Sequence, residues 1–318
     1  MYYKIELPYQ EDRRSREEMM MEEERREIAL KVGSFLTVFK DGTTLRTPSQ
    51  PEVAADGITS KDVTLDSELG QWARIFLPSP MSMSMSMSHG VGAHAHAPVV
   101  LYFHGGGCAF GSPAWDNFHT FCADMAARSG AIWISASYRL APEHRLPAAF
   151  HDSFAALQWL CSQAGCERGS SKVKVGSGGA EPEPWLDSAD FSKVFIAGES
   201  AGGTIVHHVA MRAFNHNHES ESEDRSSLHP LKIQGLIFIH PGFFRWAKTR
   251  TQEELDCPQD EFMSWDMADA CIQLTLPADY PVDTNPYFNP IPAISGLGPK
   301  FGFPPKSLVA LADHDALH

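Results

Sequence analysis

The sequence lacks any long hydrophobic run. No stretch of the 318 residues approaches the length of a membrane span, and residues 11–26 are dense in charge where a secretory leader would be apolar. Basic residues are also few, with 26 lysines and arginines against 40 acidic residues and a net charge of −14 at pH 7. These absences argue against nucleic acid or a membrane as partner and predict a soluble, cytoplasmic protein.

Paired cysteines and nucleotide-binding motifs are absent too. The cysteines form no CxxC pair and lie mostly in apolar surroundings, which predicts reduced core residues. They are Cys108, Cys122, Cys161, Cys166, Cys257 and Cys271. Neither a P-loop motif nor a GxGxxG motif between a strand and a helix is present. The histidines and methionines of residues 81–96 fix no coordination geometry, so we predict no metal and no cofactor.

One motif combines a strand, a tight turn and a helix, with a serine at the turn. Apolar residues end at Gly198, Ser200 follows two residues later, and a helical pattern begins at once in the run GESAGG. Gly198 and Gly202 stand where side chains would collide if strand and helix approach closely around a strained turn. The helix also directs its N–H groups and positive dipole end toward the serine. Ser200 is therefore a candidate nucleophile, although a serine before a helix can also be a simple cap.

A second motif supplies bare backbone amides. Residues 98–103 form a buried-strand pattern that leads through a histidine into three successive glycines, Gly105, Gly106 and Gly107. Such a loop predicts an oxyanion hole, to which the N–H of Ala201 beside the nucleophile would contribute a further donor. The two motifs, in this order, indicate acyl-transfer machinery.

Several runs in the same order strengthen this interpretation: YRLAPEH at 138–144, HPGF at 240–243 and LVALADHD at 308–315. With the glycine and serine motifs, they resemble plant-type carboxylesterases of the hormone-sensitive-lipase branch of the α/β-hydrolases, relatives of the gibberellin receptors. The resemblance begins near Phe35 and implies a serine esterase for small or medium acyl esters, with its triad in the order Ser, Asp, His. It implies that Asp315 holds the place of the acid, with Asp313 as the runner-up.

The alternation of strand and helix patterns predicts an α/β fold, a mostly parallel central sheet with helices on both faces. The resemblance makes residues 31–318 one α/β-hydrolase domain, with a helical cap inserted at about 243–290 whose aromatic residues line an acyl pocket. Residues 1–30 are expected to form a charged helix, either solvated or a lid over the site. The Met-Ser repeat at 81–88 is expected to be a surface insertion.

The resemblance also implies a histidine after one more strand, yet the sequence ends at His318. We therefore expect a domain that lacks its C-terminal strand and helix, with impaired turnover, because a triad without one member retains only residual catalysis. His240 precedes the acid, which is the wrong order for this fold. A gibberellin-receptor-like binding protein and an inactive fragment remain alternatives. Gly107 and Ala201 favour the esterase, since the receptors carry serine at both places. The oligomeric state and the substrate stay open.

Overall fold

The computed structural model describes residues 26–47, 59–78, 96–165, 182–215, 228–243, 264–277, 280, 285–290 and 305–311. The chain divides into two compact units, Met1–Thr47 and Pro48–His318.

The first unit contains a small antiparallel sheet of three strands. β1 (Ile28–Val32), β2 (Leu36–Phe39) and β3 (Thr44–Arg46) are neighbours in that order. Between β2 and β3, Gly42 adopts φ 86°, a left-handed conformation that favours glycine in a tight turn. A helix was predicted over residues 1–30, and its first 25 positions lie outside the described residues. Its last positions, 28–30, belong to β1, so that part of the prediction is wrong.

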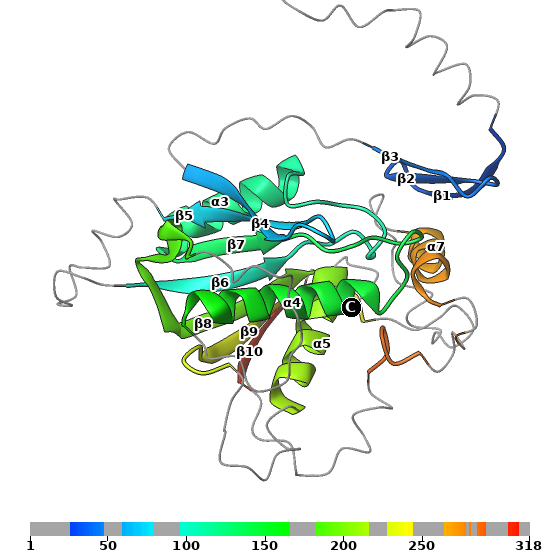
Figure 1. Ribbon diagram of the computed structural model, residues 1–318. Helices are drawn as coiled ribbons and strands as arrows, with labels where there is room; N and C mark the ends of the chain where they lie inside the picture. Colours follow the sequence, from blue (N-terminus) through cyan, green and yellow to red (C-terminus); the bar gives the residue numbers. More distant parts are fainter. Residues whose placement is uncertain are drawn as a thin grey trace, which may run out of the picture. The chain divides into compact units, whose positions relative to one another are not determined.

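The second unit is built on a seven-stranded sheet in the order β10-β9-β8-β6-β7-β5-β4 (Figure 1). The strands are β4 (Thr59–Asp66), β5 (Gln71–Leu77), β6 (Ala97–Phe103), β7 (Ile132–Ala136), β8 (Ala189–Glu199), β9 (Ile233–Ile239) and β10 (Lys306–Ala310). The pairs from β10 to β7 are parallel, and β5 joins β7 and β4 in antiparallel pairs. The central strands β6 and β7 are almost entirely apolar and buried, as expected for parallel strands that are covered on both faces.

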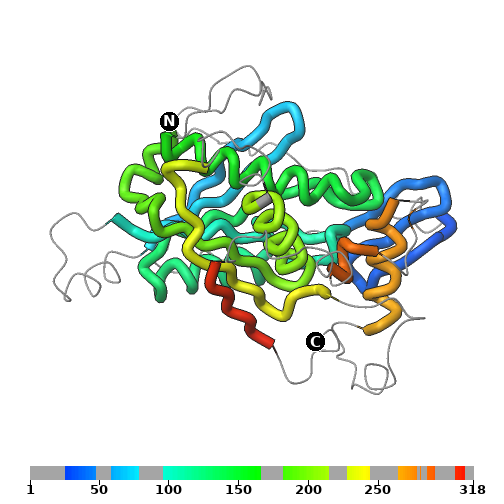
Figure 2. Tube along the Cα trace, turned by 90° about the horizontal axis from the view of Figure 1, so that it is seen from below, coloured from blue at the N-terminus to red at the C-terminus, as the bar shows by residue number. Residues whose placement is uncertain are grey.

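Helices cover the two faces of this sheet. α3 (Asp116–Ser129) packs with Tyr102 and Trp133 on one face. α4 (Ala148–Gln163) and α5 (Ala201–Asn215) share the opposite core with Val99 and Leu101, and Figure 2 shows these two helices on the same side of the sheet. The mostly parallel sheet with helices on both faces, predicted from the sequence, is confirmed.

Two predictions fare differently. Of the cap predicted at about 243–290, the structure describes one helix, α7 (Trp265–Thr275), and two short stretches at 280 and 285–290. Cys161, in the last turn of α4, is disulfide-bonded, so the prediction of reduced cysteines is wrong for this residue. Cys108, Cys122 and Cys271 are free and buried, as predicted.

Candidate active site

Ser200 occupies the turn between β8 and α5, and its backbone is strained. Its φ of 51° lies in the left-handed region, which a serine seldom adopts. Hydrogen bonds hold it there: Ser200 N donates to the carbonyl of Ile239 at 3.0 Å, and Ser200 O accepts from Gly203 N and Gly242 N, both at 2.8 Å. The strand, turn and helix predicted from GESAGG are therefore present, and the turn is tied to the end of β9.

The glycines around the serine allow strand and helix to meet. A Cβ at Gly198 would lie 2.2 Å from Gly202 O, and a Cβ at Gly202 would lie 2.0 Å from Phe103 O. Both distances are far below any real contact, and both partners are backbone atoms that cannot move aside. These are the two positions where the sequence predicted a collision.

The glycine loop, residues 104–107, follows β6 and reaches the serine. A Cβ placed on Gly105 would lie 3.4 Å from Ser200 Cβ, so the two motifs, far apart in the sequence, are neighbours in space. Gly106 and Gly107 have φ values of 104° and 59°. A Cβ on Gly106 would come 2.1 Å from Phe110 O, so this tight turn requires glycine.

A stacked pair of rings holds the glycine loop in place. The Tyr138 hydroxyl donates to His104 O at 2.8 Å, and the two rings stack with centroids 4.3 Å apart. His104 Nδ1 lies 2.7 Å from Gly105 O. Burial lowers the pKa of His104 from 6.5 to about 4, so this imidazole is neutral near pH 7. A neutral ring with a local hydrogen bond suits a structural role beneath the loop.

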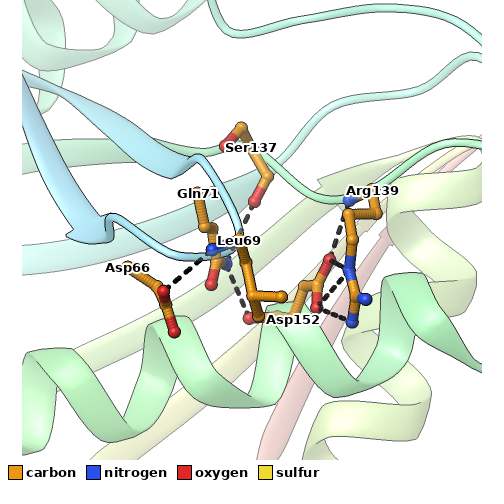
Figure 3. A network of polar contacts seen from close by, with 6 residues as sticks. All are labelled: Asp66, Leu69, Gln71, Ser137, Arg139 and Asp152. Carbon is orange, nitrogen blue, oxygen red and sulfur yellow. Dashed lines mark hydrogen bonds and ion pairs between the residues drawn. The ribbon is translucent and has the colours of Figure 1, made fainter. Parts of the chain in front are cut away.

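A polar network braces the segment that carries Tyr138. Arg139 makes charge-assisted hydrogen bonds of 2.7 to 3.1 Å to both oxygens of Asp152 on α4 (Figure 3), and these bonds raise the pKa of Arg139. Gln71 donates to the carbonyls of Ser137 and Asp152. Asp152 is 2% exposed, so its charge is buried but paired. The ion pair gives Arg139 and Asp152 a structural role. A cavity of about 320 Å³ adjoins this network.

Helix α7 contacts the glycine loop directly. A Cβ on Gly107 would lie 2.5 Å from Cys271 Sγ, so the thiol of α7 packs against this glycine. Arg145 donates to the carbonyls of Gln273 (2.8 Å) and Leu276, and Leu146 N donates to Thr275 O at 2.8 Å. These bonds satisfy carbonyls at the C-terminal end of α7. Trp265, one of the predicted pocket residues, is buried on this helix. Phe244, Trp246 and Phe262 lie outside the described residues.

The predicted acid, Asp315, and the runner-up, Asp313, lie outside the described residues, as does His318. The strand before them is described. β10 pairs in parallel with β9, with Ala310 opposite Ile239, the residue whose carbonyl accepts from Ser200 N. Asp313 and Asp315 therefore follow, by three and five residues, a strand that ends beside the serine turn.

His240 and Glu199 are site neighbours that the sequence did not single out as a pair. Glu199 is the residue before the serine, and its Oε1 lies 3.7 Å from His240 Nε2. The order of residues along the chain excluded His240 as the triad histidine. That order gives no information about which other groups His240 contacts. In the part of the chain that the structure describes, no cluster of three or more His, Cys, Asp or Glu residues could hold a metal ion. Within the same residues, no helix is long and apolar enough to cross a membrane.

Comparisons with known proteins point to one family. A family model described as alpha/beta hydrolase fold matches residues 100–318. Tuliposide A-converting enzyme b1 of Tulipa gesneriana is 32% identical over 92% of this chain and 66% of its own length, so the chain spans about two thirds of that relative. Probable carboxylesterase 13 of Arabidopsis thaliana is also 32% identical, over 92% of this chain and 82% of its own length.

Solved structures show the same fold. An esterase from Pyrobaculum calidifontis superposes with a TM-score of 0.57 at 24% identity, covering 81% of this chain and 67% of that one. A bacterial heroin esterase superposes with a TM-score of 0.59 at 19% identity, covering 84% of this chain and 69% of that one.

Proposed function

Because the chain belongs to the plant-type carboxylesterases of the α/β-hydrolase family, we propose that it hydrolyses carboxylic esters of small or medium acyl groups with Ser200 as nucleophile. The observation that carries the proposal is the meeting of two motifs. Gly105 lies against Ser200, although 94 residues separate them in the sequence of 318. Either motif alone has ordinary explanations, but their contact is the arrangement that acyl transfer needs.

In the proposed reaction, Ser200 Oγ attacks the acyl carbon of the ester, and the electron pair of the carbonyl moves to its oxygen. The N–H groups of Gly106, Gly107 and Ala201 stabilise that oxyanion. Gly105 has no side chain and so leaves room for the substrate oxygen beside them. The alcohol leaves with a proton, and water then hydrolyses the acyl-enzyme. The proton of the Ser200 hydroxyl needs a base, which the resemblance identifies as a histidine after one further strand. Asp315 would orient that histidine, which accepts the proton from Ser200 and returns it to the leaving alcohol.

The substrate class follows from the cap and from the relatives. α7 packs its buried face against the glycine loop, which supports an apolar acyl pocket closed by the cap. The tulip relatives are named for converting tuliposide A, and the Arabidopsis relatives are named carboxylesterases. The names of the Arabidopsis relatives support carboxylic esters as the substrate class.

We propose the cytoplasm as the location, because residues 11–26 are dense in charge and the chain as a whole is acidic. Some tulip relatives are named amyloplastic or chloroplastic, so a plastid is the competing location. Imaging of the full chain fused at its C-terminus to a fluorescent protein in plant cells would distinguish the two.

Purified full chain incubated with p-nitrophenyl butyrate tests the proposed activity. We expect hydrolysis above the buffer blank, and we expect Ser200→Ala to return the rate to that blank, apart from the residual catalysis that a serine-less site can retain. A rate that survives Ser200→Ala would contradict Ser200 as nucleophile. Tight gibberellin binding without ester turnover would favour the receptor-like alternative.

A further inference from the structure

Glu199, the residue before the proposed nucleophile, carries a carboxylate that is fixed from two sides. The Tyr102 hydroxyl, at the end of β6, donates to Glu199 Oε2 at 3.1 Å. His240, just after β9, places Nε2 3.7 Å from the other oxygen, Oε1. The side chains of His240 and Glu199 are 35% and 25% exposed. The carboxylate thus sits among three neighbouring strands, where their carboxyl ends converge.

This carboxylate lies nearly as close to the glycine loop as the serine does. A Cβ on Gly105 would lie 3.8 Å from Glu199 Oε1 and 3.4 Å from Ser200 Cβ. During ester hydrolysis, negative charge would develop on an oxygen held by that loop. An uncompensated carboxylate at this distance would oppose the charge, because Coulomb energies between partly buried groups are larger than in water.

The backbone of His240 is joined to the same turn. Its φ of 30° is unusual for a residue other than glycine, and its N–H donates to Ala310 O at 2.6 Å. Two residues later, Gly242 N donates to Ser200 O at 2.8 Å. A strained conformation persists only where its surroundings enforce it, so the imidazole is held at Glu199 by the framework of the serine turn.

Three further described groups that interact with Glu199 stay neutral near pH 7. They are Tyr102 and Tyr138, together with Cys122 of α3, and burial raises the pKa of all three. His240 is the basic side chain that the structure places beside the Glu199 carboxylate.

We propose that His240 is a positioning residue that neutralises Glu199, so that the oxyanion can form beside that carboxylate. This inference rests on the proposed hydrolase function. It makes a prediction of definite sign. Loss of the imidazole is harmful only while the carboxylate remains, and removal of the carboxylate repairs the harm.

The test uses His240→Asn, His240→Lys, Glu199→Gln and the double variant Glu199→Gln/His240→Asn in the full chain. Asparagine tolerates positive φ, and lysine keeps a positive charge. Two readouts are compared: kcat and KM for p-nitrophenyl butyrate, and the affinity for n-butylboronic acid, which forms a negatively charged tetrahedral adduct on a serine. His151→Gln, an exposed histidine of α4, is the matched control.

For His240→Asn we expect kcat to fall about tenfold with KM within about threefold, and boronate affinity to fall in parallel, since the charge is near but partly solvated. His240→Lys and the double variant should recover to within about threefold of wild type. Glu199→Gln alone should keep or raise kcat. If His240→Asn fails to fold, the kcat of Glu199→Gln tests the proposal by itself.

Additive losses in the double variant, or a tenfold fall for Glu199→Gln alone, would overturn the inference while leaving the hydrolase intact. A wild-type chain that neither hydrolyses the ester nor binds boronate through Ser200 would overturn the proposed function, and this inference with it.

Discussion

At the residue scale, the contacts of single glycines explain why the serine turn can form. Gly202 lies so close to Phe103 O that no side chain fits, whereas Gly105 has its nearest neighbour, Glu199 O, at 3.3 Å from a built Cβ. The two positions should therefore respond differently to the same substitution.

We expect Gly202→Ala to lower the free energy of unfolding by more than about 3 kcal/mol, because two backbone segments must separate. Gly105→Ala should stay within about 1 kcal/mol of wild type but lose activity, since its Cβ would crowd Ser200. Urea unfolding followed by circular dichroism measures both. Equal stability losses in the two variants would contradict the packing described for the turn.

His104 gives the site a pH-dependent stability. Its pKa is lowered to about 4 in the folded chain by burial, while the unfolded chain binds the proton near 6.5. The unfolded state then holds more protons between these values, so stability is present above about 6.5 and is lost as the pH falls toward 4.

Between pH 7 and pH 5, His104 should account for a loss of about 2 kcal/mol in the free energy of unfolding. His104→Gln should show a pH dependence that is smaller by this amount, and the exposed His151→Gln should behave as wild type. Because both variants are compared with themselves at two pH values, any constant cost of the substitution cancels. An unchanged pH slope in His104→Gln would show that the ring is not held neutral.

The sequence could predict those residues whose role depends only on their neighbours along the chain. Ser200, Gly198 and Gly202 follow from the turn itself, and the glycine loop follows from its lack of side chains. The pairing of Glu199 with His240 could not be predicted, because it depends on β8 and β9 being adjacent and on a positive φ at an ordinary residue. The contact of Cys271 with Gly107 likewise exists only once the cap helix is placed.

At the element scale, α7 is held against the core by the segment that contains Arg145 and Leu146. Its C-terminal carbonyls, which have no partner within the helix, accept hydrogen bonds from that segment. The helix in turn presents Cys271 to the glycine loop. The 139–147 segment, braced by Asp152, thus supports both the glycine loop and α7.

Arg145→Met should loosen the end of α7 while keeping most of the apolar stem of residue 145. We expect faster hydrogen exchange for amides of residues 265–275, with little change in exchange on β6 or β8. Arg128→Met, at the end of α3, serves as the control because it lies on another helix. Unchanged exchange in α7 would mean that Arg145 does not secure the cap.

Strands and crossover helices were predictable because their patterns are long and periodic. The expected strand at 98–103 matches β6 within a residue. The end of the N-terminal charged segment could not be predicted, because helix-forming composition gives no signal of where a strand such as β1 begins. The disulfide at Cys161 was missed for a similar reason, since an apolar neighbourhood does not reveal which cysteines approach one another.

At the scale of the whole molecule, the parallel sheet brings the working parts to one edge. The carboxyl ends of β6, β8, β9 and β10 carry the glycine loop, Ser200, His240 and the sequence that leads to Asp315. Ligand sites of open α/β sheets lie at that edge, so the order of strands gathers motifs that are scattered along the chain.

The most direct measurement treats the full chain with a fluorophosphonate probe and maps the adduct by peptide mass spectrometry. We predict one modified residue, Ser200, with labelling abolished in Ser200→Ala and retained in a variant of an exposed serine, Ser129→Ala. Labelling of a different serine, or no labelling of Ser200 by a folded chain, would contradict the account.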